Sequence, residues 1–275
     1  MTTYGFIGAG NMAGAIVRGM VAAGTPAGSV HVTGADGTAA ALAAETGVVE
    51  VGSNTELVAG ADVVVLAVKP HVVPVVAREV AEAVAVHAPL VVSIAAGLTT
   101  SRLEELLPDG TRVVRVMPNM AAAVGQAMSA LCAGSRADDD DLATARTLMD
   151  TVGRTVVLAE KDFSVFTALS GSSPAFVFTF IEALARAGVL GGIPKTQAVE
   201  IATQAVLGSA LTVQAEAGRR ADGGAGRTPA DLVDAVSSPG GTTVAGLVAM
   251  ERAGFSDAVV RAVEATVARD RELGA

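Results

Sequence analysis

Two glycine-rich turns near opposite ends of the chain carry the residue types best suited to chemistry. Residues 7–13 read Ile-Gly-Ala-Gly-Asn-Met-Ala, and residues 237–243 read Ser-Ser-Pro-Gly-Gly-Thr-Thr. In the first pattern the glycines let the backbone approach a pyrophosphate, and the helix that follows supplies unpaired N–H groups. In the second pattern, main-chain N–H groups and hydroxyls suit a small anion. Together the turns predict hydride transfer between a dinucleotide and an acceptor that carries a carboxylate.

The first turn has a simpler interpretation, because a G-x-G-x-x-A pattern on its own can be a glycine-tightened turn that binds nothing. Here it follows a predicted strand at residues 4–7 and opens a predicted helix at residues 12–23. This context, at the start of a βαβ series, favours a dinucleotide site.

The residues after the second predicted strand leave the choice between NADPH and NADH open. NAD enzymes usually place an acidic residue there to bind the ribose, whereas NADP enzymes place a base for the 2′-phosphate. This chain has Thr33, Gly34, Ala35 and Asp36. No base is present, and Asp36 falls slightly late for a ribose contact. Thr33 and the backbone that follows it could still accommodate a phosphate.

A further turn follows the predicted strand at residues 63–66. Ligands bind at the carboxyl ends of strands in open α/β sheets, so Lys69, next to Pro70, could contact ribose hydroxyls or phosphate. The alternative is a solvated surface amine. No metal site, carboxylate pair or Ser-His-Asp arrangement can be assembled from the spacing. The three histidines are predicted to be structural or at the surface: His31, His71 and His87.

The composition predicts a soluble, two-domain protein without nucleic-acid or membrane partners. The 275 residues are 51% hydrophobic and 17% charged, which is typical of a compact globular chain. A net charge of -9, 3% aromatic residues and no tryptophan argue against a nucleic-acid surface. There is neither a basic leader nor a charge-free apolar span of about eighteen residues, so we expect a cytoplasmic protein. The one cysteine, Cys132, is predicted to be a buried small residue.

The first part of the chain predicts an open parallel sheet. Short β-branched or apolar segments predict strands at 4–7, 30–33, 63–66, 90–93, 112–116, 127–131 and 155–158. Helices are expected at 12–23, 38–46, 71–86 and 100–107, and another starts in the acidic run 138–141. Strands that are apolar on both faces belong in a sheet covered by helices. We therefore expect residues 1–161 to form an α/β Rossmann-like, doubly wound dinucleotide-binding domain.

The rest of the chain predicts helices alone, at residues 163–169, 174–187, 194–217, 229–236, 243–253 and 256–273. Few of these helices are polar on every face, and a domain of this size cannot bury so much apolar surface by itself. A homodimer built from these helices is therefore expected. We predict that residues 162–275 form an all-helical dimerisation and substrate-binding domain.

The chain resembles the pyrroline-5-carboxylate reductase family over essentially its full length. The matching segments are Phe-Ile-Gly-Ala-Gly-Asn-Met at 6–12, Leu-Ala-Val-Lys-Pro at 66–70, Ser-Ile-Ala-Ala-Gly at 93–97, Arg-Val-Met-Pro-Asn at 115–119, Thr-Ala-Leu-Ser-Gly-Ser at 167–172, and residues 236–247 with Glu251. Residues 236–247 are the family's signature. The resemblance implies reduction of L-1-pyrroline-5-carboxylate to L-proline with NADPH or NADH, the last step of proline biosynthesis. It also implies a homodimer that can assemble into a decamer of five dimers.

The resemblance also implies the site residues. The cofactor is expected to touch Ile7, Gly8, Ala9, Gly10, Asn11, Met12, Asn54, Ala67, Val68, Lys69, Pro70, Ala95, Ala96 and Gly97. The substrate is expected to touch Ser238, Gly240, Gly241, Thr242 and Thr243. Thr243 is the expected catalytic residue, with its hydroxyl hydrogen-bonded to the ring nitrogen.

Three departures from the family's pattern qualify these expectations. Ser173 stands in a glycine position, Met120 and Ala121 replace Thr-Pro, and Gly34 and Ala35 replace Asn-Arg, which weakens the case for a strong preference for NADPH. Two other functions remain open. One is another reductase of the same architecture, such as a β-hydroxyacid dehydrogenase or a different imine reductase. Hydroxyacid enzymes typically carry a catalytic lysine in the long interdomain helix, and residues 174–187 contain none. The other is a cofactor-binding regulator without turnover.

Overall fold

The computed structural model describes residues 1–273, which fall into two compact units. The first unit comprises residues 1–171 together with the chain from residue 266 onward, and it contains all the strands. The second unit comprises residues 172–265 and is helical. The domain boundary expected between residues 161 and 162 stays a prediction.

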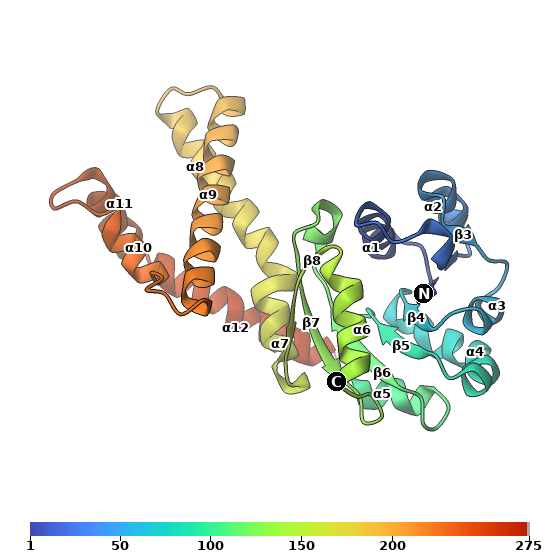
Figure 1. The fold of residues 1–275 in the computed structure, drawn as a ribbon. Coiled ribbons are helices and arrows are strands. Elements are labelled where there is room, and N and C mark those ends of the chain that lie inside the picture. Colours follow the sequence, from blue (N-terminus) through green and yellow to red (C-terminus); the bar gives the residue numbers. More distant parts are fainter. Residues whose placement is uncertain (274–275) are drawn as a thin grey trace. The chain divides into compact units, whose positions relative to one another are not determined.

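An eight-stranded sheet organises the first unit, in the order β3-β2-β1-β4-β5-β6-β7-β8 (Figure 1). Neighbouring strands are parallel except β6 and β7, which are antiparallel. The order reverses between β1 and β4, where an open α/β sheet binds its ligand. The strands are β1 (Tyr4–Ile7), β2 (Val30–Thr33), β3 (Val49–Glu50), β4 (Val63–Leu66), β5 (Leu90–Ser93), β6 (Val113–Met117), β7 (Ala127–Ala133) and β8 (Gly153–Val157).

Apolar side chains cover both faces of this sheet. Phe6 and Val65 are buried on one face with Ile16, whereas Ile7 and Val64 are buried on the other. Alternate residues of a strand point to opposite faces, so a strand buried on both sides is apolar throughout. The expected α/β doubly wound sheet is confirmed.

Helices fill the crossovers between the strands. They are α1 (Asn11–Ala22), η1 (Ala27–Ser29), α2 (Thr38–Thr46), α3 (Asn54–Ala59), η2 (Pro70–Val72), α4 (Val73–His87), α5 (Thr100–Leu106), η3 (Met120–Val124), α6 (Asp139–Asp150) and η4 (Glu160–Asp162). The acidic run is a helix start, because the Asp138 carboxylate accepts from the N–H groups of Asp140 and Asp141. The sequence pattern missed β3 and α3, since two residues and six residues are too short to show a period.

The chain leaves the sheet through α7 (Phe163–Phe166) and a π-helical turn, η5 (Thr167–Ser172). The expected helix at 163–169 is therefore not a regular α-helix, because its second half widens into this turn. π-Helical turns are rare and are frequently found at functional sites.

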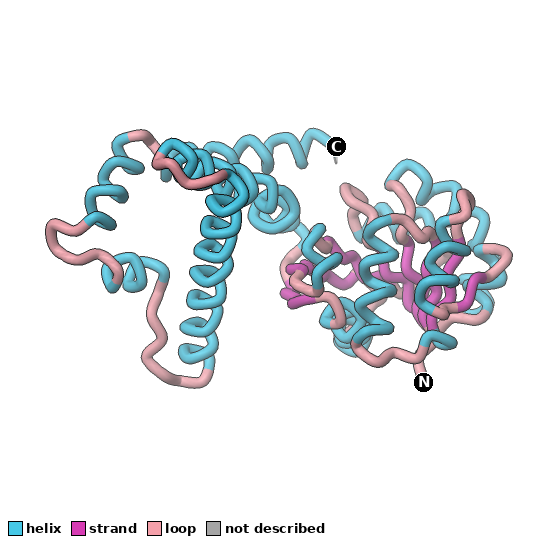
Figure 2. The backbone as a smooth tube through the Cα atoms, turned by 90° about the horizontal axis from the view of Figure 1, so that it is seen from above, coloured by secondary structure: helices cyan, strands magenta, loops and turns pink. Residues whose placement is uncertain are grey.

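The second unit is built from α8 (Ser173–Leu190), α9 (Lys195–Ala221), α10 (Pro229–Ala235), α11 (Thr242–Arg252) and most of α12 (Phe255–Leu273) (Figure 2). Residues 191–194 connect α8 to α9, and a Cβ built on Gly188 would lie 3.0 Å from Ala198 Cβ. The small side chains thus let the two helices approach closely. The Lys195 ammonium closes the same hairpin with an ion pair of 2.5 Å to Glu182. The expected all-helical region is confirmed.

Large apolar side chains remain uncovered on these helices in a single chain. Phe178 is 55% exposed, Ile201 58% and Leu211 53%. The helical stretch Glu160–Leu190 also has the length and apolar composition that would allow it to cross a membrane. Apolar surface of this extent normally meets a partner surface.

Candidate functional site

The first glycine turn connects β1 to α1 and lies against the next strand of the sheet. Gly8 has φ +102°, a conformation that favours glycine, and its N–H donates to Thr33 O at 3.0 Å. A Cβ on Gly8 would lie 2.7 Å from Ala67 O, so no side chain fits. Gly10 differs, because a Cβ there would meet nothing within 4 Å. The backbone at Gly10 is therefore open to a ligand.

The N-terminus of α1 is the donor group of this turn. Gly10 is its N-cap, and no side chain of the described residues caps it. The first N–H groups of a helix have no partner within the helix and favour an anion. The turn of residues 7–12 thus fits the pyrophosphate of a dinucleotide, as its sequence predicts.

Two other predicted cofactor segments lie at the same edge of the sheet. Ile7, Leu66 and Ser93 are in register at the ends of the parallel strands β1, β4 and β5. Residues 67–70 and 95–97 follow the last two of these strands, and Lys69 is exposed. The carboxyl ends of parallel strands meet at one edge, so the structure brings the three segments together.

Asn54, the remaining predicted cofactor residue, lies at the start of α3 and links two elements. Thr33, at the end of β2, donates from its hydroxyl to Asn54 Oδ1 at 2.7 Å. The Asn54 amide donates in turn to Glu79 Oε2 of α4 at 3.0 Å. The chain of hydrogen bonds holds Asn54 beside the carboxyl end of β2.

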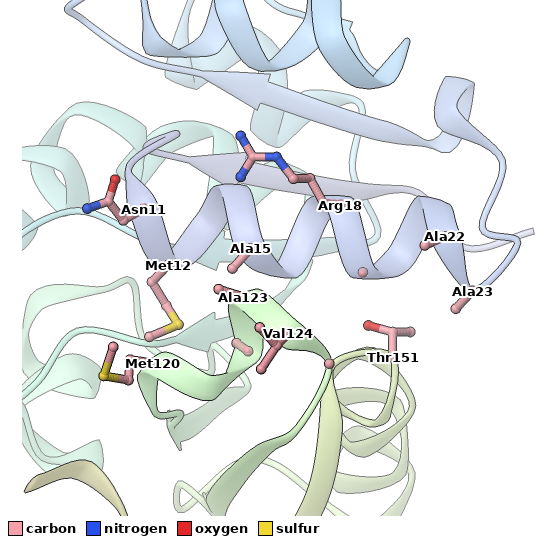
Figure 3. A pocket seen from close by; sticks show the side chains of 13 residues that line it. Asn11, Met12, Ala15, Arg18, Ala22, Ala23, Met120, Ala123, Val124 and Thr151 are labelled. Carbon is pink, nitrogen blue, oxygen red and sulfur yellow. The ribbon is translucent and has the colours of Figure 1, made fainter. Parts of the chain in front are cut away.

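A pocket of about 850 Å³ runs along α1 from this turn (Figure 3). Its lining is largely apolar and includes Asn11, Met12, Met120, Val124 and Thr151. Met120 is 58% exposed and lies on the Met12 side of the pocket. The replacement of Thr-Pro by Met120 and Ala121 therefore contributes an apolar wall beside the cofactor turn.

An ion pair that the sequence did not predict joins β6 to η4, the segment that follows the last strand. Arg115, only 8% exposed, donates to Glu160 Oε1 at 2.9 Å, and its guanidinium lies 4.4 Å from the Phe163 ring centroid. The same carboxylate accepts from the N–H and hydroxyl of Thr100 at 2.7 and 2.8 Å. Burial alone would raise the pKa of Glu160, but these hydrogen bonds hold it below its usual value.

Cys132 lies opposite Arg115 on β7, and burial raises the pKa of its thiol to about 12. Such a thiol stays protonated near neutral pH and is neither a nucleophile nor a metal ligand. Within residues 1–273, no three side chains among His, Cys, Asp and Glu gather into a cluster that could hold a metal ion.

The second glycine turn lies in the other unit, between α10 and α11. The Gly241 N–H donates to Ser238 O at 3.0 Å, and Gly240 has φ +68°. Proline followed by a glycine with positive φ is the pattern of a type II turn. A Cβ on Gly241 would meet the Ser238 hydroxyl, so a larger residue there would require that side chain to rotate.

This turn gathers the predicted substrate residues at the N-terminus of α11. Gly241 is the N-cap, and no side chain of the described residues caps the helix. Ser238, Thr242 and Thr243 are exposed beside it. The Gly241 N–H is already used within the turn, so the amides of the first helical turn and the hydroxyls are the available donors. They fit a carboxylate.

The fold and the first turn define a Rossmann-type oxidoreductase that uses a dinucleotide. Residues 3–97 match the family model described as NADP oxidoreductase coenzyme F420-dependent, and residues 160–273 match the one described as pyrroline-5-carboxylate reductase dimerisation. Pyrroline-5-carboxylate reductase 3 of Danio rerio is 39% identical over 271 residues, which span 98% of this chain and 91% of that protein. The chain belongs to the pyrroline-5-carboxylate reductase family.

Solved structures agree over the whole chain. A pyrroline-5-carboxylate reductase from Coxiella burnetii superposes with a TM-score of 0.91 at 33% identity, covering 99% of this chain and 98% of the other. The pyrroline carboxylate reductase of Plasmodium falciparum, solved with NADP bound, gives a TM-score of 0.84 at 28% identity, covering 100% and 98%. The family resemblance stated from the sequence is confirmed.

Proposed function

We propose that this protein reduces L-1-pyrroline-5-carboxylate to L-proline with a hydride from NADPH or NADH, the last step of proline biosynthesis. One observation carries the proposal: in a chain of this family, two helices begin at glycine turns without a side-chain cap. The N-terminus of α1, at the sheet edge, can bind a pyrophosphate, and the N-terminus of α11 can bind a carboxylate. The alternatives are a β-hydroxyacid dehydrogenase, a different imine reductase and a regulator without turnover, and the sequence of α8 argues against the first. The α8 helix contains no lysine.

The cofactor site of this proposal is the sheet edge. The turn Ile7, Gly8, Ala9, Gly10, Asn11 and Met12 holds the pyrophosphate through main-chain N–H groups. Ala67, Val68, Lys69, Pro70, Ala95, Ala96 and Gly97 line the path toward the nicotinamide, and Asn54 lies at the ribose end. The open space at Gly10 and the close fit at Gly8 support this placement.

The substrate site is the turn before α11. The amides of the first helical turn and the Ser238 hydroxyl bind the carboxylate, and Gly240 and Gly241 shape the loop around it. Thr242 and Thr243 contribute hydroxyls, and Thr243 bonds to the ring nitrogen. The uncapped helix start, with its partial positive charge, supports a carboxylate here.

The chemistry explains why the chain needs no residue with a specialised acid or base role. A protonated cyclic imine accepts hydride at its C=N carbon, and the bond's electron pair becomes the nitrogen lone pair of the amine. The bound dinucleotide supplies the hydride. The protein's residues then act by positioning: the α11 turn fixes the carboxylate, and Thr243 orients the ring nitrogen. The reaction further requires that the nicotinamide bound at one turn lies next to the imine bound at the other, whether the two turns belong to the same chain or to partner chains.

The helical region carries the assembly. We propose that residues 162–275 form a dimerisation and substrate domain after a dinucleotide domain of residues 1–161. The exposed apolar side chains of α8 and α9 then pack against a second chain rather than lipid, and dimers can assemble into a decamer of five. The single buried cysteine suits a reducing cytoplasm, where we place the enzyme.

The test is the loss of reduced-cofactor absorbance when purified protein is mixed with L-1-pyrroline-5-carboxylate. A panel of oxo acids, hydroxy acids and other cyclic imines serves as the comparison. We expect turnover with pyrroline-5-carboxylate far above that with the panel. Faster turnover of another member would overturn the substrate assignment, and cofactor binding without turnover of any compound would favour the regulator.

A further inference from the structure

The segment that decides between the two nicotinamide cofactors is the loop from β2 to α2, residues 33–38. It follows the strand next to β1, and Thr33 O accepts the N–H of Gly8 from the pyrophosphate turn. In this kind of sheet, the residues after the second strand lie at the adenosine ribose. A group placed here therefore faces either two ribose hydroxyls in NADH or a 2′-phosphate in NADPH.

Asp36 places a fixed negative charge in this loop. Its Oδ1 accepts from the Thr38 hydroxyl at 2.6 Å and from the Thr38 N–H at 3.3 Å. These hydrogen bonds lower the pKa of the exposed Asp36 carboxyl, so it is ionised at neutral pH. The Thr38 N–H belongs to the first turn of α2, where a phosphate would otherwise find donors. The Asp36 carboxylate therefore accepts from the helix start where a bound phosphate would otherwise accept.

The side-chain donors of the loop, the hydroxyls of Thr33 and Thr38, already have acceptors. Residues 33–54 contain no lysine or arginine and three acidic residues, Asp36, Glu45 and Glu50. Arg18, on α1, is held by Glu45 in two hydrogen bonds of 2.7 and 2.8 Å. The Thr33 hydroxyl already donates a hydrogen bond to Asn54 Oδ1, as described above. A phosphate accepts hydrogen bonds and needs positive charge, and the loop offers neither free side-chain donors nor a base.

We propose that Asp36 makes this enzyme select NADH over NADPH. Asp36 comes three residues after the end of β2, slightly later than is usual for a ribose contact, but only its Oδ1 takes part in the bonds to Thr38, which leaves Oδ2 to accept a hydrogen bond from a ribose hydroxyl. The same carboxylate repels the two negative charges of a 2′-phosphate, and no neighbouring cation offsets the repulsion. The inference rests on the proposed function, because it assumes that the glycine turn binds a dinucleotide.

The test is equilibrium binding of each reduced cofactor to the purified, assembled protein without substrate, by nucleotide fluorescence or calorimetry. We expect wild type to bind NADH at least about tenfold more tightly than NADPH at moderate salt. Asp36→Asn keeps the shape of the side chain and its contact with Thr38, and it should tighten NADPH binding roughly tenfold while weakening NADH several-fold. Ala35→Arg, at an exposed position beside it, should favour NADPH further.

Asp139→Asn is the matched control, because it removes the same charge from an exposed position on α6, at the other end of the sheet. It should leave both affinities unchanged. The inference is overturned if wild type binds NADPH as tightly as NADH, or if Asp36→Asn leaves the ratio unaltered. A wild-type protein that binds neither nucleotide would instead overturn the proposed function itself.

Discussion

The Asn119 side chain, at the start of η3 just after β6, donates from its amide to both the carbonyl and the hydroxyl oxygen of Ser170, each at 3.1 Å. Ser170 lies in the π-helical turn η5, and its hydroxyl donates to Met128 O of β7 at 3.2 Å. The start of η3 and strand β7 thus hold the turn in its unusual conformation. Both residues belong to segments that carry the family resemblance.

Asn119→Asp should loosen this turn, because an acceptor would then face the two oxygens of Ser170. We expect a loss of about 2 kcal/mol in the free energy of unfolding and a fall in kcat with little change in cofactor affinity. Urea unfolding and steady-state kinetics measure the two effects. Gln126→Ala, an exposed change in the same region, should alter neither. An unchanged kcat in Asn119→Asp would show that the turn has no part in the reaction.

Alanine substitutions at the two glycines of the first turn should have different effects, one on protein stability and the other on cofactor binding. Gly8→Ala places a Cβ 2.7 Å from Ala67 O at φ +102° and should cost about 2 kcal/mol of stability. Gly10→Ala meets no protein atom within 4 Å and should change stability by less than about 1 kcal/mol. It should nevertheless weaken cofactor binding about tenfold or more, which is about 1.4 kcal/mol. Normal binding by a stable Gly10→Ala protein would exclude the turn as the pyrophosphate site.

Thr243→Ala should lower kcat about 10- to 100-fold, because the proposed hydrogen bond to the ring nitrogen is lost. Thr243 is exposed at the start of α11, so the fold should be unaffected, as circular dichroism and unfolding can verify. Thr243→Ser keeps the hydroxyl and serves as the matched control, with kinetics near wild type. Wild-type turnover in Thr243→Ala would remove this residue from the mechanism.

Glu160→Gln should destabilise the protein by about 2 kcal/mol, because it leaves Arg115 charged in a buried place. The pKa of Glu160 is lowered on folding, so its stabilising contribution is complete above the ordinary pKa and disappears as the pH falls through the lowered value. The difference in unfolding free energy between wild type and variant should therefore shrink on acidification. Chemical unfolding across this range, at fixed protomer concentration, measures it.

Glu105→Gln is the control for this change, since the Glu105–Arg102 pair is exposed and should contribute less than about 0.5 kcal/mol. A difference between wild type and Glu160→Gln that stays constant with pH would contradict the role assigned to the ionised carboxylate.

Local patterns in the sequence predicted seven of the eight sheet strands, the helices of the second unit and both glycine turns; β3 was missed because it is only two residues long. Strands β1, β2, β4 and β5 begin and end where the sequence predicts, because each is a short run rich in β-branched or apolar residues that starts after a polar residue or proline. The glycine turns are equally local, since backbone conformation at Gly8 and Gly240 depends on the missing Cβ.

Only the tertiary structure decided which side chains support the site. Arg115 with Glu160, Asn119 with Ser170, and Thr33 with Asn54 are separated by 45, 51 and 21 residues. No period or motif links such residues, because their contact arises only when the fold brings helical segments against the sheet. The antiparallel direction of β7 is decided in the same way, by the chain's return across the sheet after η3. The sequence alone identifies the two glycine turns that are proposed to bind the ligands, whereas long-range packing determines how rigidly these turns are held.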